Sequence, residues 1–396
     1  MDVLIKNFTR ILNATPDCHK RYLYHNIDWD SRLIGIVGAR GTGKTTLMLQ
    51  HIKANFPKKE HVLYASLDNI WFTNHSLVDL AEKFDAYGGT YLFLDEAHRY
   101  PAWAIEIKNI YDSFPDMRIV FTGSSMLKIF DSNADLSRRV VNYELKGLSF
   151  REFLLLEDVM DLPVLSLEDI LQNHQTIASE IVGKIKILPE FKKYLRYGYY
   201  PIFKEGIKSY EMKLKNIVNT ILENDLPAVE SIDYSTIYKL KKLLMILSAL
   251  VPYSPNINQL SNNIETNRAS ALKYLDILKK AALIQTFLYS QKGLGLMTKP
   301  DKIYLNNTNL LYALVEGNVN TGNIRETFFA NQTSAKYSVT TSDKGDFKIN
   351  GKVFETGGES KTFAQIKDIP DGYLAIDEIE VGYCNRIPLW LFGFLY

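Results

Sequence analysis

The feature that most constrains this chain is a short glycine-rich stretch near its N-terminus. Residues 38–45 read GARGTGKT, which matches the phosphate-binding loop pattern GxxxxGK(S/T) at every fixed position. An apolar run at 33–37 precedes the stretch, and apolar residues at helical spacing follow it at 46–52. The order strand, loop, helix predicts backbone N–H groups that surround phosphate groups at a helix N-terminus.

This pattern predicts ATP and Mg²⁺ as ligands. Lys44 is expected to neutralise the β- and γ-phosphates, and the hydroxyl of Thr45 is expected to bind Mg²⁺. The loop residues predicted to contact ATP are Gly38, Ala39, Arg40, Gly41, Thr42, Gly43, Lys44, Thr45 and Thr46.

A second, acidic motif favours hydrolysis over mere nucleotide binding. The apolar residues 91–94 are followed directly by Asp95 and Glu96. Asp95 is expected to bind Mg²⁺ beside Thr45, and Glu96 to act as the general base on the attacking water. The letters DEAH at 95–98 also spell a helicase motif, but no second ATPase lobe is recognisable after residue 150. His98 is therefore interpreted as a structural or coupling histidine.

A third apolar strand, predicted at 118–121, ends in small hydroxyl residues. Thr122 or Ser124 is expected to sense the γ-phosphate or to position the water, and the sequence does not choose between them. A predicted strand at 61–67 and a predicted helix at 76–84 lie between the motifs. Alternating strands and helices predict a largely parallel sheet with the nucleotide at the carboxyl edge of its strands.

Together with LSRR at 136–139 and LSFREF at 148–153, these motifs resemble those of the prokaryotic AAA+ ATPases of the archaeal-type ATPase group. The resemblance implies that a winged helix and a PD-(D/E)xK nuclease-like domain of unknown function follow the ATPase core. It also implies an arginine finger that enters a neighbouring subunit's site, so Arg138 or Arg139 is a catalytic candidate in a homo-oligomer such as a hexamer. A surface pair that anchors a loop is the alternative.

The fold class is therefore predicted to be α/β, in four parts. These are a P-loop AAA+ core with a parallel sheet at 1–150, a helical lid at 151–235, a winged-helix domain at 236–317, and a small α/β domain resembling a degenerate PD-(D/E)xK nuclease at 318–396. Arg196 is a candidate second sensor arginine by position alone, and a solvated helix face is the alternative reading.

Basic charge is concentrated in the third part. The whole chain has 46 basic and 45 acidic residues, whereas residues 236–300 hold nine basic and two acidic ones. Helices are predicted at 240–250, 257–264 and 267–282, the last capped by Thr266, and strands at 284–289 and 302–305. This order is typical of a winged helix and predicts DNA as a partner, with packing or oligomerisation as the alternative. The predicted DNA contacts are Arg268, Ser270, Lys273, Lys279 and Lys280 on the third helix and Lys292 at the wing tip.

The last part resembles the PD-(D/E)xK nuclease fold found in this family. A helix is predicted at 323–331 and strands at 337–339, 345–349 and 352–355. Glu326, Asp346 and Glu355 are the acidic residues of the resemblance, but Gly357 stands where active members have a lysine. We therefore expect that cleavage has been lost. The alternative is an ATP-gated nuclease in which Lys361 replaces the missing lysine.

Composition limits where such a protein works. No apolar run approaches the roughly 18 residues of a membrane-spanning helix, and the N-terminus lacks an apolar signal core. Cys18 and Cys384 are too few for a disulfide framework, so a cytoplasmic location is expected. We expect ATP hydrolysis between subunits, coupled to DNA binding or remodelling. The alternative is a nucleotide-controlled signalling or defence switch that acts through a protein partner.

Overall fold

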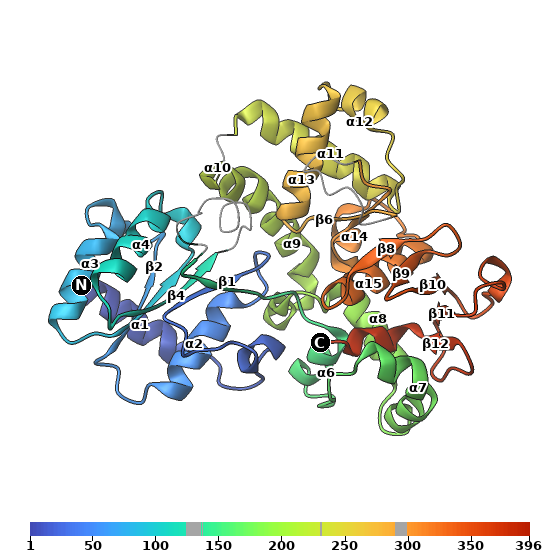
Figure 1. The fold of residues 1–396 in the computed structure, drawn as a ribbon, viewed down its shortest axis with the longest axis horizontal. Coiled ribbons are helices and arrows are strands. Elements are labelled where there is room, and N and C mark those ends of the chain that lie inside the picture. Colours follow the sequence, from blue (N-terminus) through green and yellow to red (C-terminus); the bar gives the residue numbers. More distant parts are fainter. Residues whose placement is uncertain (124–135, 137, 230–231, 290–298) are drawn as a thin grey trace. The chain divides into compact units, whose positions relative to one another are not determined.

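The computed structural model describes residues 1–123, 136, 138–229, 232–289 and 299–396. It divides into two compact units (Figure 1). Unit 1 contains Met1–Lys146 and Asn219–Asp233, and unit 2 contains Gly147–Val218 and Tyr234–Tyr396. The predicted lid at 151–235 is therefore split, because its residues from 219 to 233 pack with the N-terminal unit.

Unit 1 is built on a five-stranded sheet with the order β2-β3-β4-β1-β5, and every neighbouring pair is parallel. The strands are β1 (Leu33–Val37), β2 (Val62–Ser66), β3 (Tyr91–Asp95), β4 (Arg118–Gly123) and β5 (Val141–Glu144). The helices are α1 (Asp2–Ala14), α2 (Lys44–Asn55), α3 (Leu77–Ala86), α4 (Trp103–Ser113) and α10 (Leu226–Val229). All five residues of β1 are buried, as expected for a strand covered on both faces. The predicted parallel α/β sheet is confirmed.

Unit 2 begins with helices and ends with a mixed sheet. Its helices are α6 (Phe150–Leu156), α7 (Leu167–Val182), α8 (Ile187–Tyr197), most of α9 (Tyr210–Thr220), α11 (Tyr234–Leu250), α12 (Ile257–Asn263), α13 (Arg268–Lys280), α14 (Thr308–Leu314) and α15 (Thr321–Ser334). Strands β6 (Ile284–Phe287) and β7 (Lys302–Leu305) form an antiparallel pair. The C-terminal sheet has the order β12-β11-β10-β9-β8. Its strands are β8 (Val339–Thr341), β9 (Phe347–Ile349), β10 (Lys352–Gly357), β11 (Gly372–Ile376) and β12 (Arg386–Pro388).

Local side-chain chemistry explains where several helices start. Ser76 and Ser149 each accept a hydrogen bond from the backbone three residues later, in a capping box. One predicted cap is wrong. The side chain of Asn267, and not Thr266, caps α13 by accepting a hydrogen bond from the backbone N–H of Ser270.

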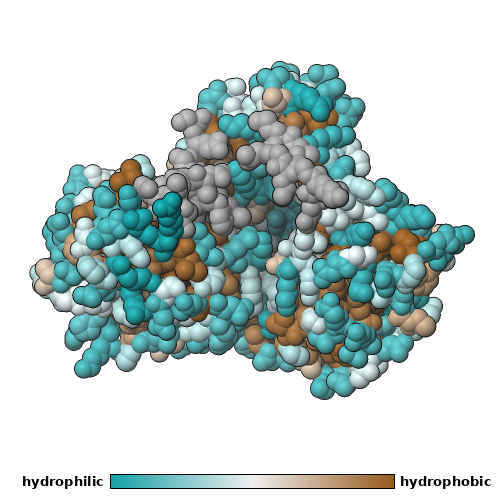
Figure 2. All heavy atoms as spheres, viewed as in Figure 1, coloured by the Kyte–Doolittle hydropathy of each residue, from teal (hydrophilic) through white to brown (hydrophobic). Residues whose placement is uncertain are grey.

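Hydrophilic residues dominate the face drawn in Figure 2, and apolar residues are exposed there in scattered groups. Within the described part of the chain, the helices are too short or too polar to cross a membrane.

Candidate nucleotide-binding site

The glycine-rich loop connects β1 to α2 at the carboxyl edge of the sheet in unit 1. Gly43 precedes α2 with a left-handed backbone (φ 94°, ψ 23°), which glycine adopts without steric cost. Gly38 is required for a different reason. A Cβ atom at this position would lie 2.3 Å from the carbonyl oxygen of Leu145. The backbone of the loop therefore requires glycine at both positions.

Lys44 is held inside this loop. The residue is 5% exposed, and Nζ donates to the carbonyl oxygens of Gly38 at 3.0 Å and Ala39 at 2.9 Å. Burial disfavours the charged form and lowers the pKa of Lys44 from 10.5 to about 8, against the opposing charges of Glu96 and Asp95. A cation with so little solvent is suited to bind phosphate oxygens.

Arg21 fixes the outside of the loop and was not predicted from the sequence. It is 8% exposed, and its guanidinium donates to the carbonyl oxygen of Thr42 and, at 2.8 Å, to that of Lys146. The hydroxyl of Thr42 donates to the carbonyl oxygen of Ala39 at 2.9 Å. The described contacts thus tie the loop both to itself and to the N-terminal segment.

The second acidic motif meets the loop as predicted. The hydroxyl of Thr45 donates to Oδ2 of Asp95 at 2.7 Å, although the two residues are 50 positions apart. Asp95 is 3% exposed and also accepts hydrogen bonds from the hydroxyls of Tyr64, at 2.9 Å, and Thr122. A hydroxyl beside a fixed carboxylate is a donor set that fits Mg²⁺ together with phosphate oxygens and water.

Glu96 follows Asp95 in an unusual backbone conformation. Its φ of 52° is uncommon for a residue other than glycine, and its backbone N–H donates to the hydroxyl of Thr122 at 3.1 Å. Its carboxylate remains 21% exposed and lies 3.6 Å from both Arg40 and His98. The strained turn therefore places a partly hydrated carboxylate next to the loop.

Asp225 belongs to residues 219–233, which pack with unit 1, and it lies beside these charged side chains. Its role was not predicted from the sequence. Its side chain is 1% exposed and lies 3.2 Å from Arg40, 2.9 Å from Arg99 and 3.9 Å from His98. Burial opposes ionisation, but the hydrogen bond with His98 and the charges of Arg40 and Arg99 lower the pKa of Asp225 below its ordinary value.

The other predicted catalytic residues have different surroundings. Ser124 lies outside the described residues, which leaves Thr122 as the hydroxyl seen in contact with Asp95. Arg138 is exposed, whereas Arg139 binds both carboxylate oxygens of Asp112, at 3.0 and 3.1 Å.

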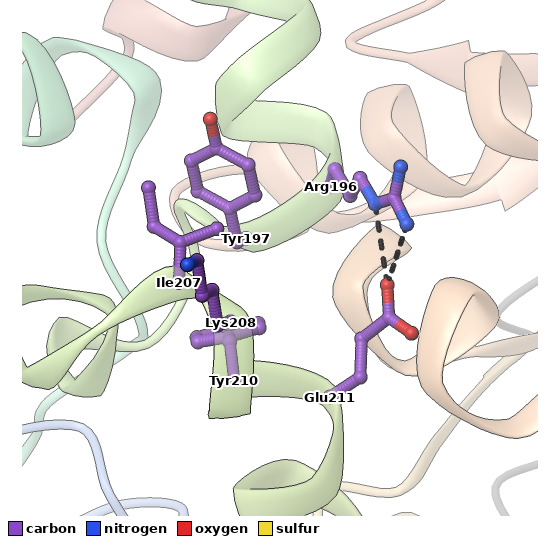
Figure 3. A pocket seen from close by; sticks show the side chains of 6 residues that line it. All are labelled: Arg196, Tyr197, Ile207, Lys208, Tyr210 and Glu211. Carbon is purple, nitrogen blue, oxygen red and sulfur yellow. Dashed lines mark hydrogen bonds and ion pairs between the residues drawn. The ribbon is translucent and has the colours of Figure 1, made fainter.

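In unit 2, Arg196 is bound to Glu211 at 2.9 Å beside an open pocket (Figure 3). Its side chain is 58% exposed. This environment agrees with a solvated helix face.

The predicted DNA contacts on α13 lie on two adjacent faces of its solvent-exposed side. Arg268 and Lys279 are about three turns apart and share one face, whereas Lys273 and Lys280 are about two turns apart and share the other. Arg268, Lys273 and Lys279 are exposed, whereas Ser270 and Lys280 are partly buried and Lys280 lies 3.2 Å from Asp276. Lys292 lies outside the described residues.

The three acidic residues of the C-terminal part are close enough to influence one another. Burial and the charge of Asp346 raise the pKa values of Glu326 and Glu355. Lysines compensate this charge. Lys361 pairs with Glu355, and Lys302 lies 3.6 Å from Glu326 and 3.7 Å from Asp346. Over the described ranges, no cluster of three or more His, Cys, Asp or Glu side chains is arranged to hold a metal ion.

The chain is similar to known families over two stretches. Residues 30–154 match the model of a family described as an AAA domain, and residues 188–321 match a domain of unknown function, DUF8612. An uncharacterized protein of Methanocaldococcus jannaschii is 31% identical over 268 residues, which are 64% of this chain and 56% of the relative. An uncharacterized protein of Haemophilus influenzae is 24% identical over 310 residues, or 72% of this chain and 70% of the relative.

Similar solved structures include AMPPCP-bound DnaA from Aquifex aeolicus. It has 17% identity and a TM-score of 0.29, with 66% of this chain and 85% of that chain covered. Domain III of the replication initiation protein DnaA from Thermotoga maritima has 18% identity and a TM-score of 0.27, with 46% and 92% covered. The chain spans little more than half the length of the Methanocaldococcus relative. The family match places the similarity to an AAA domain at residues 30–154, the stretch that contains the glycine-rich loop before α2.

Proposed function

We propose that unit 1 binds ATP with Mg²⁺ and hydrolyses it. The observation that carries the proposal is the contact of 2.7 Å between the Thr45 hydroxyl and the Asp95 carboxylate, beside a loop that encloses Lys44. A metal ion held there would neutralise charge that develops on the phosphate oxygens. The buried carboxylate of Asp95 would hold this ion, and Lys44 would orient the phosphates.

Glu96 is the proposed general base. A carboxylate next to the site can accept the proton of the attacking water, and its partial exposure leaves room for that water. Arg40 and His98, both 3.6 Å away, fix the orientation of the carboxylate. The backbone hydrogen bond from Glu96 to Thr122 connects this base to the strand that carries the hydroxyl sensor candidate.

The experiment compares two variants with opposite expected defects. Glu96→Gln should bind ATP within about twofold of the wild type but lose about 10²- to 10⁴-fold of its hydrolysis rate, the usual effect of removing a general base. Lys44→Ala should lose ATP binding itself. Glu82→Gln, which removes an exposed carboxylate from α3 in the same unit, is the matched control and should behave as the wild type. Normal turnover in Glu96→Gln would refute the assigned base.

We further propose that hydrolysis is coupled to DNA through the helices and strands of residues 234–305. The support is the concentration of basic residues at 236–300 and the order α11, α12, α13, β6, β7, which is typical of a winged helix. The alternative is a nucleotide-controlled switch that binds a protein partner. A DNA-coupled enzyme should turn over ATP faster when duplex DNA is added, whereas a switch should ignore DNA.

A further inference from the structure

The segment that returns to unit 1 places one buried acid among the cations of the candidate site. Asp225 ends a π-helical turn (Ile221–Asp225), a rare conformation that is often found at functional sites. Its carboxylate lies 3.2 Å from Arg40 in the phosphate-binding loop and 2.9 Å from Arg99, just after β3. One acid from a distant part of the sequence therefore binds one cation of the loop and one cation that follows β3.

These cations are positioned to bind something other than Asp225. The side chains of Arg40 and Arg99 are 30% and 25% exposed, so neither is sealed from solvent. Arg40 also lies 3.6 Å from Glu96, the proposed base. Lys44 is within electrostatic range of Asp225 and of Arg40. The guanidiniums that bind Asp225 therefore lie next to the expected phosphate site.

We propose that Asp225 is a positioning residue that acts as an internal anion, holding Arg40 and Arg99 until the phosphates of a bound nucleoside triphosphate replace it. The inference rests on the ATP binding proposed above. A triphosphate carries several negative charges, so it competes with a single carboxylate for the same guanidiniums. Asp225 thereby makes the conformation of residues 221–229 depend on the nucleotide state.

Replacement of Asp225 by phosphates would affect residues 219–233, because of their position in the chain. Residues 219–233 lie between two stretches of unit 2, which end at Val218 and resume at Tyr234. The π-helical turn also follows directly on α9. Release of Asp225 would therefore loosen the segment through which the chain enters and leaves the nucleotide-binding unit.

The first test measures nucleotide affinity in Asp225→Asn, which keeps the shape of the side chain and removes its charge. Without the competing anion, ATP should bind about threefold to tenfold more tightly than to the wild type, an effect suited to a partly exposed ion pair. AMP, which has one phosphate, should show a smaller change. Glu223→Gln removes an exposed acid from the same turn and should leave both affinities unchanged. Equal or weaker ATP binding by Asp225→Asn would overturn the inference.

The second test uses the wild-type protein, so it tests the role of Asp225 even if Asp225→Asn does not fold. Amide hydrogen exchange is followed with and without ATP and Mg²⁺. We expect slower exchange in residues 38–46 and faster exchange in residues 221–229. Protection of the loop without faster exchange at 221–229 would refute the role of Asp225 and leave ATP binding intact. Absence of loop protection would refute ATP binding, and the inference with it.

Discussion

Burial brings the pKa of Lys44 into a pH range that solution experiments can reach. Its pKa is lowered to about 8, and the charged groups that influence it are Glu96, Asp95, Arg40 and Asp225. Phosphate groups would favour the charged form, so the pKa of Lys44 should be higher in the ATP complex than in the free protein. Between these two pKa values, ATP binding takes up a proton.

We therefore predict that ATP affinity falls as the pH rises above about 8, by up to about tenfold per pH unit. Isothermal titration calorimetry in two buffers with different ionisation enthalpies should detect the proton uptake. Unfolding does not explain such a loss. The pKa of Lys44 is about 8 in the folded protein and 10.5 in its ordinary state. Between these two pH values the unfolded chain binds more protons than the folded one, so the contribution of Lys44 to the free energy of unfolding increases as the pH rises. A constant affinity from pH 7 to 9.5 would contradict the prediction.

The residues of the site differ in how easily their positions can be predicted from the sequence. Lys44, Thr45 and Asp95 belong to short motifs whose spacing follows from the chemistry of phosphate binding, so the sequence predicted that they meet. Arg21, Tyr64 and Asp225 reach the same site through tertiary packing. No fixed spacing marks such contacts. A buried acid at the end of a helix, such as Asp225, has no sequence signal that separates it from an exposed one.

At the scale of secondary-structure elements, α13 allows a test of the DNA proposal. Its exposed basic residues lie on two adjacent faces of one solvent-exposed side, so salt dependence can tell whether a duplex contacts one face or both. Phosphate contacts release counterions, and the slope of log affinity against log salt measures their number.

If the face with Arg268 and Lys279 contacts DNA, each change to alanine should reduce this slope by about 0.9 and weaken binding similarly for all sequences. Lys273→Ala on the other face should then have little effect. Lys184→Ala removes an exposed lysine near the end of α7 and is the control. Fluorescence anisotropy at several salt concentrations measures the slopes. Affinity without salt dependence in the wild type would exclude a phosphate-based interface and favour the protein-partner alternative.

Element predictions succeeded where the local pattern was strong. The buried strands of unit 1 are continuous apolar runs, and α11, α12 and α13 show helical spacing, so the sequence located them. The strands β11 and β12 were not predicted. β12 has only three residues, and both strands are positioned by pairing in the mixed sheet, which depends on residues distant in sequence. The loss of cleavage predicted for this sheet remains a prediction.

At the scale of the whole molecule, the chain has two compact units, whereas the sequence suggested four parts in series. The sequence could not reveal that residues 219–233 pack with unit 1, because such packing depends on residues that are distant in the chain. Family models match two stretches of the chain, residues 30–154 and residues 188–321. At this scale we predict that a second copy of the chain completes the nucleotide site.

The surroundings of the two candidate finger residues distinguish them. Arg139 binds Asp112 of its own subunit with two hydrogen bonds, whereas Arg138 is exposed. We therefore predict that Arg138→Ala retains ATP binding and loses about 10³-fold or more of the hydrolysis rate, as expected for an arginine finger. Arg139→Ala should have a smaller effect. In the wild type, ATPase activity should rise faster than linearly with protein concentration.

Mixing inactive variants tests the shared site directly. Glu96→Gln lacks the base and Arg138→Ala lacks the finger, so an interface between them can combine an intact base with an intact finger. Hydrolysis should recover in this mixture. It should not recover when Glu96→Gln is mixed with Lys44→Ala, because both changes damage the nucleotide-binding face and every interface contains one of them. Equal inactivity of the two mixtures, together with wild-type activity strictly proportional to concentration, would show that one chain contains the complete active site.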